Sequence, residues 1–181
     1  MHSALDPLVL ASGLALTLIA CGASQRPDGG SGLLPVGSTT PPELSALDQN
    51  GKAHTLAEEH GHPVIVYFYP KDGTPGCTKE ACAFRDIWKS YTNAGVQVFG
   101  VSADDQISHE QFAKEQKLPF PILADPQRTW ITAFGVGTRL GMASRVSFLL
   151  DKDGKVAKIY PDVDPAFHAD QVLRDAAALP K

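Results

Sequence analysis

Short apolar segments recur through the chain, separated by longer stretches of mixed polarity. Residues 63–69 (PVIVYFY) form a continuous run of β-branched and aromatic side chains, which is typical of a central strand buried on both faces. Residues 96–102 and 121–124 predict two more strands, and residues 145–150 and 156–160 predict a β-hairpin.

The stretch after the first of these strands shows the signals of a helix. Thr74 is a preferred N-cap residue, Pro75 suits the first helical position, and Gly95 is placed to end the helix. The apolar side chains recur at i, i+3, i+7 and i+10, which predicts one stripe on a single helix: Ala81, Phe84, Trp88 and Tyr91.

Another helix is expected to begin at Ser108. Gln111 completes the spacing of a capping box, and Ile107 is placed to pack on Phe112 as a hydrophobic staple. Two further helices are expected to begin at Asp125 and at Asp164.

Near the start of the patterned region, Asn50-Gly51 separates two short apolar segments, which predicts a hairpin with a type I′ turn. Strands and helices then alternate, and the chain closes with a hairpin and a helix. This order predicts an α/β fold in which helices flank a mixed central sheet on both faces.

The N-terminal part of the chain differs from the rest. Residues 8–20 form an uncharged apolar run, short for a bilayer span but typical of a signal-peptide core, and Leu-Ile-Ala-Cys at its end resembles a bacterial lipobox with Cys21 as the lipidated residue. Lys and Arg are missing before the run, so a misassigned start codon and an uncleaved anchor stay as alternatives. We divide the chain into a signal peptide (1–20), a flexible Gly/Ser/Pro-rich tether (21–42) and a folded domain (43–181).

Composition narrows the set of partners. The chain of 181 residues has 16 basic and 20 acidic side chains, a formal net charge of −4, and no basic cluster. Nucleic acid and anionic membrane surfaces are therefore poor partners, and membrane contact is expected only through a lipid anchor. None of the six histidines has a metal-ligand spacing with a cysteine, and no phosphate-binding glycine loop is present, so we expect no metal and no cofactor.

Two cysteines lie in the helix expected after Thr74. Cys77 falls in its first turn, where unpaired N–H groups and the positive end of the helix dipole favour a thiolate. Cys82 follows five residues later, which indicates a nucleophile with a second cysteine to capture it after oxidation. Two buried structural cysteines are the alternative, although they would not need a capped, Gly-containing helix start. Residues five apart on an intact helix have Cα atoms about 8.6 Å apart, whereas a disulfide needs less than about 7 Å, so the helix start must unwind before the two cysteines bond.

Residues 67–86 (YFYPKDGTPGCTKEACAFRD) resemble the active-site segment of peroxiredoxins of the bacterioferritin-comigratory or peroxiredoxin Q type. The match includes the Pro-x3-Thr-x2-Cys spacing of Pro70, Thr74 and Cys77, and a Cys-x4-Cys spacing that is particular to part of the family. The resemblance extends from about residue 37 to the C-terminus. It implies a thioredoxin-like fold and a thiol peroxidase that reduces hydrogen peroxide and organic hydroperoxides and is recycled by a thioredoxin-like reductant.

The resemblance also implies residue roles within this segment. Cys77 would be the peroxidatic nucleophile, and Cys82 would be the resolving cysteine. Thr74 would hydrogen-bond the peroxide in addition to capping the helix. Pro70 would shield the cysteine from water.

A cation near the sulfur has to come from elsewhere in the chain. Arg145, at the start of the strand RVSFLL, resembles the family's active-site arginine, and Arg139 is its competitor. Glu80 resembles the glutamate that orients this arginine. A carboxylate on the helix surface is the alternative for that residue.

Two other functions are weighed against a peroxidase. A thiol–disulfide oxidoreductase of the thioredoxin class needs Cys-x-x-Cys, and Thr74 stands where its first cysteine would be. A copper-binding chaperone on the same fold uses Cys-x3-Cys and a histidine, which is not the spacing here. We expect a monomer, anchored by lipid in the bacterial cell envelope, with a periplasmic or cytoplasmic location as the alternative.

Overall fold

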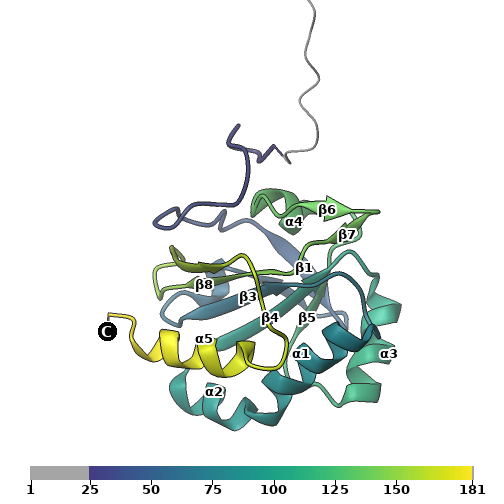
Figure 1. Ribbon diagram of the computed structural model, residues 1–181. Helices are drawn as coiled ribbons and strands as arrows, with labels where there is room; N and C mark the ends of the chain where they lie inside the picture. The colour runs from purple at the N-terminus through teal and green to yellow at the C-terminus, as the bar shows by residue number, and fades with distance from the viewer. Residues whose placement is uncertain (1–24, 181) are drawn as a thin grey trace, which may run out of the picture.

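A seven-stranded mixed sheet forms the centre of the computed structural model, which describes residues 25–180 (Figure 1). The strand order is β2-β1-β5-β4-β3-β8-β9, in which β3, β4 and β5 are parallel and the other neighbours are antiparallel. The strands are β1 Ser45–Asp48, β2 Ala53–Thr55, β3 Val64–Phe68, β4 Gln97–Ser102, β5 Ile122–Ala124, β8 Val146–Leu150 and β9 Val156–Tyr160. A separate hairpin pairs β6 Thr138–Arg139 with β7 Met142–Ala143.

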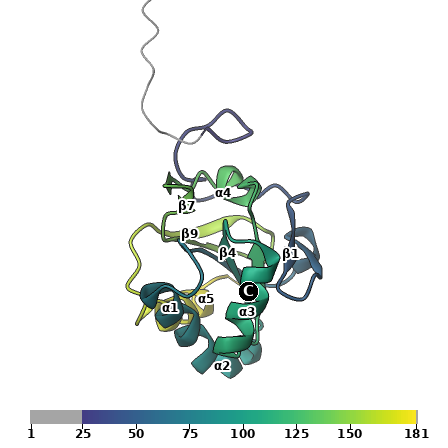
Figure 2. The ribbon, with the colours of Figure 1, turned by 90° about the vertical axis from the view of Figure 1, so that its right-hand side faces the viewer.

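Helices cover both faces of the sheet, which confirms the predicted architecture (Figure 2). The helices are η1 Ala57–Glu59, α1 Pro75–Asp86, α2 Trp88–Ala94, α3 Gln106–Gln116, α4 Thr129–Ala133 and α5 His168–Ala177. α1, α2, α3 and α5 pack on one face, and α4 packs on the opposite face.

The central strand β3 is buried along its whole length, as its apolar run predicts. Alternate side chains enter the two core layers, because successive residues of a strand point to opposite faces. Val64, Val66 and Phe68 join the layer under α4, whereas Ile65, Tyr67 and Tyr69 join the layer under the other helices.

The helix expected between Thr74 and Gly95 is two helices. α1 and α2 meet at Ile87, whose backbone (φ −111°, ψ 19°) is outside the helical region. The bend keeps the predicted apolar stripe on the sheet, because Phe84 and Tyr91 on either side of it are both fully buried with ring centroids 5.5 Å apart. Gly95 ends α2 in the left-handed conformation (φ 67°), as predicted.

The predicted capping box at Ser108 is wrong. α3 begins earlier, with Asp105 as its N-cap, and the Asp105 carboxylate accepts a hydrogen bond from the Ser108 N–H at 2.9 Å. Ile107 is 77% exposed, so it forms no staple with Phe112. Asp105, three residues before Ser108, caps the helix in its place. The Ser108 hydroxyl donates its hydrogen bond to Asp72 and caps nothing.

The β1–β2 hairpin exists, but its turn is not type I′. The Gly51 N–H bonds the Asp48 carbonyl at 3.0 Å, and only Gly51 in the turn has a positive φ (78°), which is a type I turn followed by a bulge. The Asp48 side chain accepts from the Asn50 N–H at 2.8 Å and stabilises this form.

The helices expected from Asp125 and Asp164 begin later, at Thr129 and His168, because each aspartate first caps a turn.

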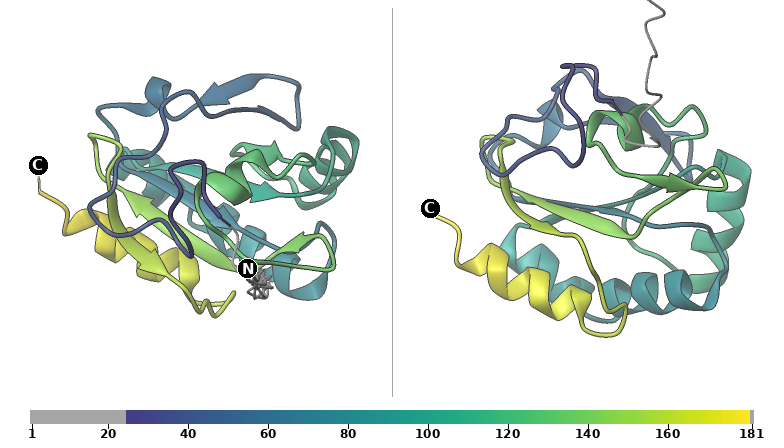
Figure 3. Two further views of the ribbon diagram at one scale, coloured as in Figure 1. Left: turned by 90° about the horizontal axis from the view of Figure 1, so that it is seen from above. Right: turned by 45° about the horizontal axis from the view of Figure 1, so that its top comes forward.

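The predicted flexible tether is wrong over its described part. Residues 25–42 cross the sheet on the side of α4 (Figure 3). Leu34 is 5% exposed and its N–H donates to the Phe134 carbonyl at 2.9 Å, while Gly37 donates to the Val156 carbonyl at 2.8 Å. The segment is therefore packed on the domain despite its Gly/Ser/Pro-rich composition, because its backbone groups form hydrogen bonds with the domain.

The signal peptide, Cys21 and residues 21–24 of the predicted tether lie outside the described residues, so the predictions about them stay predictions. Among residues 25–180, none of the helices combines the length and the apolar character that a membrane crossing needs.

Replacing Leu34 by Ala tests whether residues 25–42 belong to the folded unit. We expect the free energy of unfolding to fall by about 2–3 kcal/mol, because the buried side chain leaves a cavity among Phe134 and its neighbours. Val36→Ala in the same segment is the control; Val36 is 61% exposed, and its loss should cost less than about 0.5 kcal/mol. Urea unfolding measures both, and equal small effects would mean that the segment is a loose tether.

Candidate active site

The site forms where the carboxyl end of β3 meets the amino end of β8. In the antiparallel register Phe68 pairs with Val146, so Arg145 lies beside the point where the chain leaves β3 for α1. Cys77 and Arg145, far apart in sequence, thereby meet at the ends of these two strands.

Cys77 lies in the first turn of α1, as predicted, and is 1% exposed. Arg145 Nη2 donates to its Sγ at 3.2 Å. Gly76 leaves room for this approach, because a Cβ on that residue would lie 3.2 Å from Arg145 Nη2 and the guanidinium would have to shift by a few tenths of an ångström. The N–H of Cys77 has no acceptor within the helix at this position, so the sulfur lies at the positive end of the helix dipole as well as beside a guanidinium.

Glu80 is fully buried and forms an ion pair with Arg145 through Oε2, so the surface alternative for this residue is wrong. Burial raises the pKa of Glu80 from 4.5 to about 7, although the charge of Arg145 acts in the opposite direction. Burial by itself would lower the pKa of Arg145. The neighbouring Glu80 and Cys77 outweigh this effect and raise the pKa of the guanidinium above its ordinary value. The carboxylate therefore holds the guanidinium against the sulfur.

Thr74 occupies the N-cap position, but its hydroxyl does not cap α1. The Oγ1 hydrogen is donated to the Lys71 carbonyl at 3.1 Å, which leaves the lone pairs of Oγ1 free to accept from a bound molecule. Pro70 lies half-buried at the end of β3, beside this loop.

Cys82 lies on the same helix as Cys77, and both thiols are free. Its half-buried thiol points to α3, where it contacts Gln116 Oε1 at 3.6 Å. Arg85 of the same helix also contacts Gln116, because its Nη1 donates to the Gln116 carbonyl at 2.7 Å.

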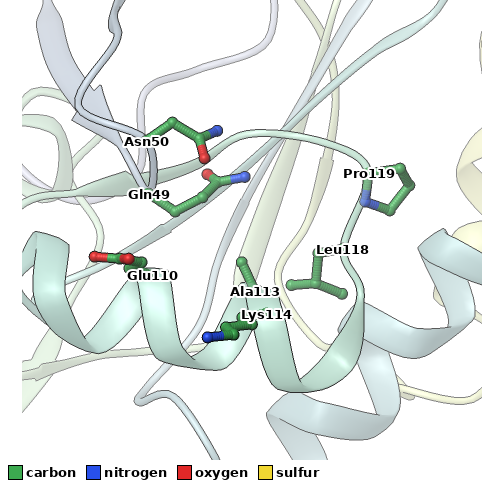
Figure 4. Close-up of a pocket in the computed structure, with 7 residues that line it drawn as sticks. All are labelled: Gln49, Asn50, Glu110, Ala113, Lys114, Leu118 and Pro119. Carbon is green, nitrogen blue, oxygen red and sulfur yellow. The ribbon is translucent and has the colours of Figure 1, made fainter.

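The competing cation, Arg139, lies exposed on β6, and Cys77 is bound by Arg145 instead. A surface pocket of about 390 Å³ lies between the β1–β2 turn and α3 (Figure 4). None of the site residues lines it, and its buried amide, Gln49, already bonds Phe120 and Ile122. It is not part of this site.

Sequence reasoning missed two buried histidines near the site. His168, from α5, bonds Ser147 Oγ at 2.8 Å, and burial together with the charge of Arg145 lowers its pKa to about 4. His109, from α3, bonds Asp72 in the loop before Thr74. Neither has a spacing signal, because both meet their partners only through the fold. Over residues 25–180, no group of three or more metal-ligating side chains is clustered.

The fold and the site define a class of protein: a thioredoxin-like α/β domain with a buried cysteine held by an arginine–glutamate pair. Among solved structures, the chain is similar to peroxidoxin BcpB from Mycobacterium tuberculosis (TM-score 0.75, 32% identity, covering 82% of this chain and 99% of that one). It is also similar to peroxiredoxin Q from Xanthomonas campestris (TM-score 0.73, 32% identity, covering 79% of this chain and 97% of that one).

Residues 36–159 match the AhpC/TSA family. The chain is 43% identical over 139 residues to the chloroplastic peroxiredoxin Q of Gentiana triflora, covering 75% of this chain and 64% of that protein. It is 42% identical over 139 residues to the chloroplastic peroxiredoxin Q of Sedum lineare, covering 75% of each. The chain belongs to the AhpC/TSA family and is of the peroxiredoxin Q type within it. It spans 64% of the length of the Gentiana relative.

The raised pKa of Glu80 predicts a pH dependence of stability. The folded protein binds this proton more tightly than the unfolded chain does, so the contribution is fully present below about pH 4.5 and is lost as the pH rises through about 7. The stability of the wild type relative to Glu80→Gln should therefore fall by up to about 3 kcal/mol between pH 4.5 and pH 8. Urea unfolding of both proteins at several pH values measures it. If the wild type instead became more stable than Glu80→Gln as the pH rises, the pairing of Glu80 with Arg145 would outweigh the burial of Glu80.

Proposed function

We propose that the chain is a thiol-specific peroxidase that reduces hydrogen peroxide and organic hydroperoxides through Cys77. One observation carries the proposal: a buried thiol in the first turn of a helix contacts a guanidinium that a buried carboxylate holds in place. A structural cysteine would have no use for this costly ion pair.

The first step is attack on the O–O bond. The Cys77 thiolate attacks one peroxide oxygen, so an S–O bond forms and the O–O bond breaks. The products are a Cys77 sulfenic acid and water or an alcohol, after the leaving oxygen takes a proton. Arg145 lies where it stabilises the negative charge that develops on that oxygen. Thr74 Oγ1, whose hydrogen is used on Lys71, accepts a hydrogen bond from the peroxide O–H. Pro70 keeps water from the sulfur.

The second step uses Cys82. Its thiolate attacks the sulfenic sulfur, so the S–S bond forms and hydroxide leaves as water after protonation. Both cysteines belong to α1, and on an intact helix their Cα atoms are about 8.6 Å apart, too far for a disulfide. The first turns of α1 therefore unwind in each cycle, and the Cys82–Gln116 contact breaks.

A thioredoxin-like dithiol then reduces the disulfide, which regenerates both thiols. The competing function, a thiol–disulfide oxidoreductase of the thioredoxin class, is less well supported because Thr74 replaces the first cysteine of Cys-x-x-Cys. A monomer, lipid-anchored at Cys21 in the bacterial cell envelope, remains part of the proposal on the sequence signals alone.

Replacing each cysteine by serine should separate the two steps. Cys77→Ser should abolish peroxide consumption, because the hydroxyl is far less nucleophilic than a thiolate. Cys82→Ser should consume one equivalent and leave a sulfenic acid on Cys77. Stopped-flow kinetics with hydrogen peroxide, followed by trapping with a dimedone reagent and mass spectrometry, measures both. Substantial turnover by Cys77→Ser would show that the nucleophile is assigned wrongly.

Oxidation should unwind α1 locally. Amide hydrogen exchange should become faster from Cys77 to Phe84 in the disulfide form, because that part of the helix has to open. Exchange from Trp88 onward should change little, since α2 is a separate helix held by the buried Tyr91. Equal protection of residues 77–84 in the two forms would argue against Cys82 as the resolving partner.

A further inference from the structure

Asp72, in the loop between β3 and α1, is the centre of a buried polar network. Its carboxylate accepts from three side chains: Tyr69 Oη at 2.7 Å, Ser108 Oγ at 2.8 Å and His109 Nδ1 at 2.8 Å. Its N–H donates to Asp104 Oδ2 at 2.9 Å. The loop is thus attached to the ends of β3 and β4 and to the first turn of α3.

His109 provides the innermost link of the network. Its side chain is 0% exposed, and Nε2 lies 3.1 Å from the Leu123 carbonyl on β5, which can only accept, so Nε2 carries a hydrogen. Burial alone would raise the pKa of Asp72, but the bonds from His109, Tyr69 and Ser108 hold it below its ordinary value. The His109 ring therefore bridges the Asp72 carboxyl group and the Leu123 carbonyl, which joins the loop to β5.

The network lies one hydrogen bond away from the peroxide site. Asp72 follows Lys71 directly, and the Lys71 carbonyl takes the hydrogen of Thr74 Oγ1. The direction of that carbonyl sets which way the Thr74 lone pairs point. Two residues beyond Thr74, Gly76 makes room for Arg145. A loop held less firmly would shift the Thr74 acceptor relative to Cys77 and Arg145.

We propose that His109 and Asp72 are positioning residues for the peroxide site, fixing residues 71–74 so that Thr74 presents its lone pairs to the substrate. The inference rests on the proposed function of Cys77 and Thr74. Neither His109 nor Asp72 is placed to touch the peroxide; both act through the Lys71 carbonyl.

The chain contains a matched control for this pair. His54 and Asp48 form a second buried, hydrogen-bonded histidine–aspartate pair, with Nε2 and Oδ2 3.0 Å apart and both side chains less than a tenth exposed. This pair stabilises the β1–β2 hairpin and belongs to none of the elements that form the site. Loss of either histidine removes a buried partner of a carboxylate, so general destabilisation should be comparable.

Two substitutions of His109 separate its two bonds. Asn places a donor near the position of Nδ1 and keeps the link to Asp72, whereas Gln places one near Nε2 and keeps only the link to Leu123. We expect His109→Gln to lower the second-order rate constant for oxidation of Cys77 by hydrogen peroxide about tenfold or more. His109→Asn and His54→Asn should stay within about 1.5-fold of the wild type. The later rate of disulfide formation should not change in any of them.

A second readout does not depend on peroxidase activity. Amide hydrogen exchange of residues 71–77 in the reduced protein should be faster in His109→Gln than in His109→Asn or His54→Asn. Tyr69→Phe, which removes only the hydroxyl that bonds Asp72, is the milder variant in case His109→Gln does not fold, and it should slow Cys77 oxidation about threefold.

Equal rates for His109→Gln and the wild type would overturn the proposal, as would equal losses in His109→Gln, His109→Asn and His54→Asn. Without folded His109→Gln, an unchanged rate in Tyr69→Phe overturns it. If the wild type itself reacts no faster with peroxide than Cys77→Ser does, the proposed function fails instead. The exchange of residues 71–77 then still decides whether His109 positions the loop.

Discussion

The ion pair between Glu80 and Arg145 is the interaction on which the site depends. A carboxylate with no exposed surface is costly to bury, and one partner without the other would leave an uncompensated charge in the core. In this site the buried carboxylate fixes the guanidinium against the Cys77 sulfur. The arrangement is possible only because the β3–β8 register places Arg145 beside the first turn of α1.

The proposed chemistry places two demands on α1 that conflict. Attack on a peroxide needs the helix intact, since its first turn supplies the N–H donors around Cys77. A disulfide with Cys82 needs the same turns to open. The structure separates these demands in space. The bend at Ile87 makes α2 a helix of its own, anchored by the buried Tyr91, so opening at the start of α1 leaves α2 packed on the sheet.

The loop before α1 is held in a different way from the helix itself. Hydrogen bonds from Asp104 just after β4, from β5 and from α3 converge on Asp72 and His109, and this network is buried. Such a network is stable only when all of its members are satisfied. The fixed loop and the helix that has to open therefore meet near Gly73 and Thr74, which is where the peroxide is expected to bind.

The sequence by itself determined the α/β class, the buried strand β3, the start of α1 at Pro75, and the position of Cys77 in the first turn of that helix, with Thr74 just before it. These depend on local periodicity, on helix-start chemistry and on a family motif with fixed spacing, all of which are properties of the linear chain. The sequence did not determine which alternative held for Glu80, whether Arg139 or Arg145 reaches the sulfur, or that residues 25–42 are packed. It also gave no sign of the Asp72–His109 pair. Each of these is decided by contacts between segments far apart in the chain, since strand register and helix packing, which no local pattern encodes, set which side chains meet.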